Sequence, residues 1–314
     1  MATDTDIPSS LPSPRHVEAM VMGADAFLEM GMLIVGVERY QWYSAEKNIA
    51  IFKEEFGATP SSVNDLWSDL REMELLTKKS RPKHLLMTIR FLWMYPTLGP
   101  LGRFFKIDSK NTVRKWIHHF VPRIAQVMSK RMVKWKDADL GQTFFMSVDG
   151  TCCRIEEPRP FSKIYSCHKF GGHAGVNYEI GMSIILQKLL WVYGPTLPGL
   201  HNDLEVARQA LLPKLRAYGN GKRIIADGIY GAASESDVVS IDNEFDPREV
   251  AEFKERVCSR HEKFNNLLKL WDCLEDVFRH GITFHRECFH AVVAIVCIQL
   301  DNGSYSLFDP YPMC

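Results

Sequence analysis

Apolar residues recur every three to four positions along the first half of the chain, the spacing expected of helices that bury one side. The stretches with this pattern are 17–35, 45–56, a helix that begins after a cap at Ser61 or Ser62, and 84–94. Pro96 and Pro100 follow the last of them, and residues 1–16 are polar with three prolines. The pattern predicts a short disordered tail followed by an all-helical region over residues 17–140.

The segment from Leu98 to Val127 predicts two helices joined by a tight turn. The first would run from about Pro100 to Phe105, and the turn would be Lys106–Ser109. The second helix would direct these apolar residues inward: Val113, Trp116, Ile117 and Phe120. It would direct these polar residues outward: Lys110, Asn111, Thr112, Arg114, Lys115 and His118. Pro122 is expected to start a further helix that reaches about Lys134.

This arrangement has two interpretations. It can be a helix-turn-helix whose second helix enters a DNA major groove, where Arg and Asn read base edges and Lys holds phosphate. It can also be an ordinary helical hairpin with exposed basic residues; the apolar pattern alone does not separate the two, and the surrounding positive charge favours DNA.

From residue 141 onward the hydrophobic pattern is that of short apolar strands alternating with helices, which predicts an α/β domain over residues 141–314. The expected strands are Phe144–Val148, Lys163–Cys167, Tyr178–Leu186, a continuation or partner at Leu189–Tyr193, and Lys222–Ala226. The expected helices are 200–217, 247–280 and 285–300. Two strands, the first and the last, are each followed directly by Asp-Gly.

Composition is that of a globular protein: 314 residues, 46% apolar and 24% charged. No apolar run reaches the roughly 18 residues that a transmembrane helix needs, so no membrane contact is expected. The N-terminal residues lack a hydrophobic signal core, which argues against secretion. Eight cysteines without a CxxC pair are most simply reduced thiols in the cytosol or nucleus.

Charge is strongly segregated although the net charge is zero. Residues 78–136 hold 15 Lys and Arg against one acidic residue, which gives +14. The preceding 77 residues carry −8 and residues 137–314 carry −6. A block this basic favours contact with a polyanion such as DNA over a merely solvated helical surface.

Three acidic residues are candidates for catalysis. Asp149 and Asp227 end the two Asp-Gly strands, and Glu262 lies on the predicted helix 247–280. Strand ends of a β/α domain can meet at one sheet edge, and three converging carboxylates can hold two divalent ions about 4 Å apart. Such a site supports phosphodiester cleavage and strand transfer. The structural alternatives are an Asp-Gly hairpin turn at Asp149 and a helix cap at a further acid, Asp203.

Several short motifs occur together around these acids. They are Ser147-Val148-Asp149-Gly150, Ile164-Tyr165-Ser166 with Lys169, Tyr178-Glu179-Ile180, Pro198-Gly199 with Asn202-Asp203, Ala226-Asp227-Gly228 with Tyr230, and Arg260-His261-Glu262 with Phe264-Asn265 and Lys269. In this combination, the region from about Gln142 to Phe308 resembles the DDE-type transposase domain of the PIF/Harbinger superfamily.

The resemblance implies a ribonuclease-H-like mixed sheet flanked by helices and a metal-dependent DNA endonuclease or transposase that uses Mg²⁺ or Mn²⁺. By motif position, Asp149, Asp227 and Glu262 would form the catalytic triad. Asp203 matches a fourth acid facing the metal. The substrate would be double-stranded DNA at transposon ends, in the nucleus, with a second DNA-binding protein or a further copy of the chain as partner. His261 and Lys169 would either touch DNA phosphate or have structural roles.

Two alternatives stay open. The chain can be a domesticated, transposase-derived DNA-binding protein without catalysis. It can also be an unrelated soluble enzyme in which these acids are caps and turns.

Overall fold

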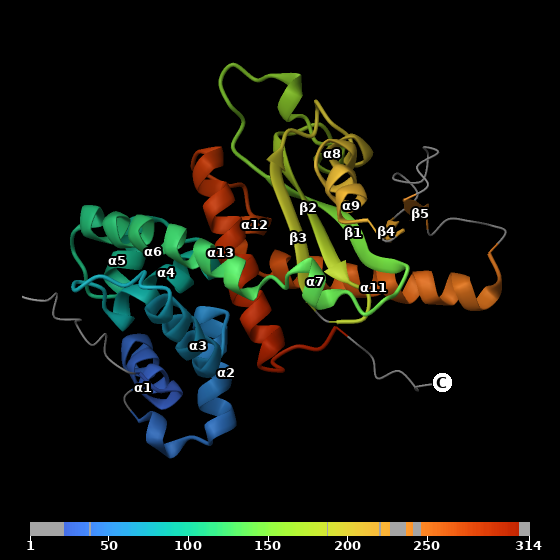
Figure 1. Cartoon of the computed structure of the whole chain (residues 1–314). Helices are drawn as coiled ribbons and strands as arrows, with labels where there is room; N and C mark the ends of the chain where they lie inside the picture. Colours follow the sequence, from blue (N-terminus) through green and yellow to red (C-terminus); the bar gives the residue numbers. More distant parts are fainter. Residues whose placement is uncertain are drawn as a thin grey trace, which may run out of the picture.

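The structure is a computed structural model and describes residues 22–37, 39–186, 188–219, 221–226, 237–240 and 246–307. Within these ranges it is a mixed α/β protein with twelve α-helices and a five-stranded mixed open sheet. Helices of the first half form one side of the molecule and the sheet with its flanking helices forms the other (Figure 1).

In the described part of the chain, seven α-helices precede the sheet: α1 (Ala24–Val35), α2 (Ala45–Phe56), α3 (Pro60–Glu72), α4 (Pro82–Met94), α5 (Leu98–Phe104), α6 (Lys110–Arg131) and α7 (Trp135–Ala138). The predicted helix 45–56 is confirmed at both ends. The third helix begins earlier than predicted, because Pro60 occupies its first turn and the Thr59 hydroxyl, rather than Ser61 or Ser62, caps it by accepting from Ser62 N at 3.3 Å.

The prediction that Pro122 starts a new helix is wrong. Pro122 lies inside α6, a single helix of 22 residues. A proline inside a helix removes one backbone hydrogen bond. The helix continues nevertheless because its apolar side, including Val121, Ile124 and Val127, is fully buried in the core and α6 packs along α13.

The sheet has the order β3-β2-β1-β4-β5. Its strands are β1 (Phe144–Arg154), β2 (Gly175–Ser183), β3 (Leu189–Thr196), β4 (Arg223–Ala226) and β5 (Val238–Ser240). Neighbours β1–β2 and β2–β3 are antiparallel, whereas β1–β4 and β4–β5 are parallel. The stretch 189–193 is therefore a separate partner strand and not a continuation of β2.

Two strand predictions are corrected. β1 does not end at Asp149 but runs on to Arg154, because β2 pairs with it as far as Arg154 opposite Gly175. The stretch Lys163–Cys167 is no strand, and Lys163–Tyr165 forms a single 3₁₀ turn. In a segment flanked by polar loop residues, local turn hydrogen bonds replace strand pairing.

Two helices lie between β3 and β4: α8 (Asp203–Gln209) and α9 (Leu211–Tyr218). Three follow β5: α11 (Arg248–Lys269), α12 (Asp272–Glu275) and α13 (Ile282–Asp301). The predicted helix 200–217 is split at Ala210, whose φ of −124° is not helical. The predicted helix 247–280 ends at Lys269, and a short turn leads into α12.

Helix α13 joins the two halves of the molecule. It packs on α6 on one side and reaches the sheet on the other, where Tyr178 of β2 stacks on Phe289 at a ring distance of 3.6 Å (Figure 1). The largest apolar cluster accordingly contains residues of both halves. Among the described helices, only α13 is long and apolar enough to span a membrane, but 72% of its apolar window is buried within the protein, as in a core helix.

Opposite faces of the sheet carry different helices. Helix α11 covers one face, where Val257 packs with Ile225 of β4. Helices α8 and α9 cover the other face, where Ala207 and Leu215 pack with Val148 of β1. Since alternate residues of a strand point to opposite faces, successive residues of β1 meet different helices.

Candidate metal-binding site

Asp149 lies in the middle of β1 and is half-buried. Its Oδ2 accepts a hydrogen bond of 2.8 Å from Asn265 Nδ2 on α11. Its Oδ1 accepts one of 2.8 Å from the backbone N–H of Gly150. Two donors therefore hold the carboxylate in one orientation, and hydrogen bonds to an ionised acceptor are the stronger kind.

Helix α11 is fixed along β1 by three polar side chains spaced four residues apart. His261 Nδ1 lies 3.1 Å from Ser147 Oγ, and Lys269 Nζ donates to Cys152 O at 2.7 Å, with the Asn265–Asp149 contact between them. Residues at this spacing share one side of a helix. The spacing of His261, Asn265 and Lys269 was visible in the sequence, but the partners on β1 were not.

His261 is almost fully buried, and burial lowers its pKa to about 3. A neutral imidazole packed under the sheet has a structural role, so the alternative in which His261 touches DNA phosphate is not supported by its place in the fold.

Asp203 approaches β1 at Gly150. It is the first residue of α8, which begins with a capping box between Asn202 and Glu205. A side chain on Gly150 would bring its Cβ within 2.9 Å of Asp203 Oδ1, so only glycine leaves room for this carboxylate. The carboxylates of Asp149 and Asp203 thus both lie against the backbone of Gly150.

A cation accompanies this pair of acids. Lys169 belongs to a 3₁₀ turn (His168–Phe170), and its Nζ donates to the carbonyl of Gly150 at 3.3 Å. Gly150 is therefore contacted by three charged side chains, two acidic and one basic. The Gly150 carbonyl is a partner within the protein for Lys169, which agrees with a structural role for this residue rather than contact with DNA phosphate.

The structure describes one of the two remaining predicted acids. Glu262 is exposed on α11, one residue after His261 and one helical turn before Asn265. Asp227 lies outside the described residues. The strand that precedes it, predicted as Lys222–Ala226, is confirmed as β4, and its last residue, Ala226, pairs with Val148 next to Asp149.

Oxygen atoms dominate this site, which is the donor chemistry that Mg²⁺ and Mn²⁺ prefer. Besides the carboxylates of Asp149 and Asp203, the Oδ1 atom of Asn265 is buried and makes no hydrogen bond within the described part of the chain. These are oxygen donors of the kind that a hard divalent cation takes. Among the described residues no three His, Cys, Asp or Glu side chains come together as a metal-binding group.

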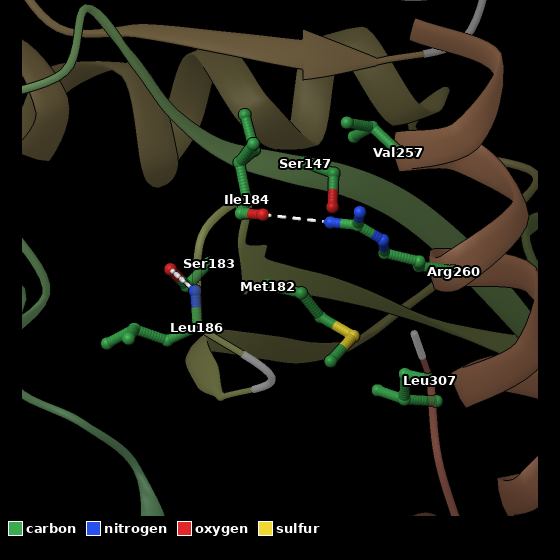
Figure 2. A pocket seen from close by; sticks show the side chains of 8 residues that line it. All are labelled: Ser147, Met182, Ser183, Ile184, Leu186, Val257, Arg260 and Leu307. Carbon is green, nitrogen blue, oxygen red and sulfur yellow. Dashed lines mark hydrogen bonds between the residues drawn. The ribbon is translucent and has the colours of Figure 1, made fainter. Parts of the chain in front are cut away.

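A shallow pocket lies farther back along β1 on the same face. Arg260 of α11 reaches between Ser147 and the β2–β3 connection, and its Nη1 donates to Ile184 O at 2.9 Å (Figure 2). Met182 and Leu307 line its apolar side. The guanidinium therefore places a basic group at this end of the α11 face, from a residue that belongs to one of the sequence motifs but had no predicted role.

The candidate DNA-contacting residues lie at the start of α6, in the helical region that precedes the sheet. Ser109 caps the helix by accepting from Thr112 N at 3.3 Å. The predicted division of α6 is confirmed: its four apolar residues are buried, Thr112 is half-buried, and the remaining polar ones are exposed. The exposed set is Lys110, Asn111, Arg114, Lys115 and His118. His118 also packs on Phe284 of α13, at a ring distance of 4.4 Å.

Comparison with family models, with curated proteins and with solved structures finds no match for this chain.

Proposed function

We propose that the protein is a metal-dependent DNA endonuclease of the transposase type, with a ribonuclease-H-like nuclease domain and a helix-turn-helix in the helical region. The observation that carries the proposal is that the carboxylates of Asp149 and Asp203 each lie next to Gly150, beside the parallel pair β1–β4. A mixed sheet with helices on both faces is consistent with the proposed fold.

In this proposal Asp149, Asp203, Asp227 and Glu262 hold Mg²⁺ or Mn²⁺, with Asp149, Asp227 and Glu262 as the catalytic triad. When bound, the metal supplies activation of an attacking water or 3′-hydroxyl and stabilisation of the leaving oxygen. Asn265 is a positioning residue, because it holds Oδ2 of Asp149 from the helix that also carries Glu262. Lys169 tempers the repulsion between the two acids through its contact with Gly150.

Double-stranded DNA would be held by the helical region. The exposed residues Lys110, Asn111, Arg114 and Lys115 begin α6 within the block of charge +14, and the preceding α5 and turn complete a helical pair. Thr112 would contribute from the same first turn. The further proposals are nuclear location, transposon ends as substrate, and a second DNA-binding protein or another copy of the chain as partner.

One observation favours the non-catalytic alternative, a domesticated DNA-binding protein. The described residues bring two of the proposed acids to Gly150 but contain no complete group of three metal-binding side chains. If that alternative holds, DNA binding survives while cleavage is absent.

The experiment is a nicking assay on supercoiled plasmid DNA with Mg²⁺ or Mn²⁺, comparing wild type with Asp149→Ala. The proposal expects metal-dependent nicking by wild type and none by the variant. Asp25→Ala, which removes an exposed acid from α1, is the matched control and should nick like wild type.

Cleavage that survives Asp149→Ala would remove the proposed mechanism. Absence of cleavage in wild type, together with salt-sensitive DNA binding, would support the domesticated alternative. Absence of both would leave neither proposal standing.

A further inference from the structure

Two cysteine side chains meet beside the candidate metal-binding site. Cys152 Sγ lies 2.6 Å from Cys167 Sγ, against about 2.05 Å for a covalent disulfide bond. Both residues are almost fully buried, at 6% and 3% exposure. The pair belongs to two separate elements, since Cys152 is on β1 and Cys167 precedes the 3₁₀ turn His168–Phe170.

The fold brings these two sulfur atoms together in a specific way. The segment around Cys167 closes on itself through Cys167 N, which donates to His173 O at 3.0 Å, and the bridge between Ser166 and Ala174. Gly175 follows directly, and a side chain there would place its Cβ 2.8 Å from Cys152 Sγ. Glycine at this position therefore leaves the space in which the sulfur atoms meet.

The alternation of side chains along β1 explains why Cys152, and not its neighbour Cys153, faces Cys167. Adjacent residues of β1 point to opposite faces. Cys153 is fully buried on the α11 side, where its Sγ lies 3.7 Å from Lys269 Nζ. Cys152 lies two residues beyond Gly150 and points to the same face of β1 as the Gly150 position that Asp203 approaches.

The two thiols are unlike in acidity. The hydrogen bond from Cys152 and backbone N–H groups of Lys169 and Phe170 lower the pKa of Cys167, while the same thiol pairing raises the pKa of Cys152. A thiolate is the reactive form in disulfide exchange, so Cys167 is the attacking group and Cys152 the resolving one. The residues after Cys167, His168 and Lys169, are exposed, which leaves this side of the pair near solvent.

We propose that Cys152 and Cys167 form a reversible, redox-active dithiol–disulfide pair that takes its oxidising equivalents from a low-molecular-weight disulfide. The Cys167 thiolate attacks one sulfur of oxidised glutathione, forms a mixed disulfide and releases one glutathione thiolate. Cys152 then attacks the Cys167 sulfur, loses its proton to the solvent, and releases the second glutathione thiolate. Two protein thiols lose two electrons, and one glutathione disulfide becomes two glutathione thiols after protonation.

The bond would tie the Lys169 turn to β1 next to Gly150. In the reduced state Lys169 Nζ contacts Gly150 O through a turn held by local hydrogen bonds. A covalent link between positions 152 and 167 restricts the chain between them, which stabilises the folded state. Formation of the bond itself does not depend on the proposed nuclease function, so failure of one does not entail failure of the other.

The test is equilibration of the full chain in glutathione buffers from reducing to oxidising, followed by acid quench, alkylation of free thiols and tryptic mass spectrometry. The expected product is one cross-linked pair of peptides, 137–154 with 164–169, that disappears on reduction. Because peptide 137–154 contains both adjacent cysteines, Cys153→Ser should retain the link and Cys152→Ser should abolish it. The oxidised wild type should also melt on the order of 5 °C above the reduced form.

Cys258→Ser is the matched control. It removes a half-buried cysteine of α11 and should form the same cross-link as wild type. The wild-type map needs no variant, so a misfolded Cys152→Ser protein does not void the test. Alkylated or singly glutathionylated Cys167 at the most oxidising buffer, without the cross-link, would overturn the proposal. So would a link that persists in Cys152→Ser or one that joins Cys152 to Cys153.

Discussion

The basic start of α6 and the acidic surroundings of Gly150 are opposite in more than charge. Side chains at the start of α6, such as Arg114 and Lys115, end in solvent on a helix whose apolar side is buried. Asp149 is half-buried, and two donors fix both of its oxygens. The start of α6 would attract a polyanion through the sum of its positive charges. The surroundings of Gly150 would act through the positions of a few oxygen atoms. Substitutions should therefore have small, additive effects in the first and large, position-specific effects in the second.

The largest effect is expected from Asp203→Asn or Asp149→Asn. Each keeps the shape of the side chain but removes one of the two negative charges at Gly150, and loss of a metal ligand is worth several kcal/mol. We predict a loss of about 10³-fold in the metal-dependent nicking rate. Unchanged DNA affinity in a filter-binding assay would confine the effect to the acidic region. A nicking rate within a few fold of wild type would contradict the role of these carboxylates.

Glu262→Gln is predicted to reduce nicking by about 10²-fold, because Glu262 lies one turn from Asn265 on the helix that holds Asp149. Glu255→Gln is the matched control, since it changes an exposed acid on the same side of α11, two turns earlier. Rate measurements on both variants decide the assignment. Equal rates for the two would remove Glu262 from the proposed triad.

Asn265→Ala removes the amide that holds Asp149 Oδ2. Loss of a residue that orients a metal ligand typically costs 10–100-fold, and we predict about tenfold here. The distinguishing measurement is the Mn²⁺ concentration for half-maximal nicking, which should rise, while the unfolding midpoint changes little. Asn266→Ala changes the exposed neighbour and should leave that concentration unchanged. The opposite pattern would assign Asn265 a purely structural role.

In the basic region, replacement of Lys110, Arg114 and Lys115 by Gln should weaken DNA binding about tenfold and lower its salt dependence by roughly one unit of slope per residue. Binding isotherms at several salt concentrations measure this. A control with Lys134→Gln and Lys136→Gln removes exposed charges from the same basic block beyond the end of α6. Equal losses in both variants would show that overall charge, and not the start of α6, determines binding.

The smallest effect concerns pH and tests the rigidity of the α11–β1 contact. Burial lowers the pKa of His261 to about 3, below its ordinary 6.5, so the folded protein binds this proton less readily than the unfolded chain. Stability from this group is complete above pH 6.5 and is lost as the pH falls toward 3, at up to about 1.4 kcal/mol per pH unit. His261→Gln should flatten that part of the slope in urea unfolding at pH 7 and pH 5. A slope identical to wild type would contradict the prediction.

Periodicity predicted helices well where one side of each helix is simply apolar. The helix 45–56 and the inward and outward sides of α6 are confirmed because burial alone decides them. Periodicity failed where tertiary packing overrides a local signal. Pro122 would end an isolated helix, but the buried apolar side of α6 keeps the helix continuous.

Strand ends were the harder problem. Asp149-Gly150 has the composition of a turn, yet β2 pairs with β1 well beyond it. The sequence therefore predicted Asp149 at the end of a strand, whereas it lies in the middle of β1. Asp227 lies outside the described residues, so its place beside Asp149 stays a prediction.

Contacts between distant residues were not predictable from spacing. Asn265 was part of a recognised motif, but only the docking of α11 along β1 gives it Asp149 as a partner. Gly150 was expected to allow a turn, whereas in the fold it makes room for Asp203. Pairings of this kind depend on how helices and strands pack together. The spacing of apolar residues predicts the helices and strands but not their contacts.

The most direct test of the central claim is a crystal structure of the full chain soaked in Mn²⁺, with the ion located by its anomalous scattering. The account predicts a manganese ion bound by carboxylate oxygens of Asp149 and Asp203 next to Gly150, and its loss in Asp149→Asn crystals. Ordered crystals with no manganese at Gly150, or with the ion bound only elsewhere on the protein, would contradict it.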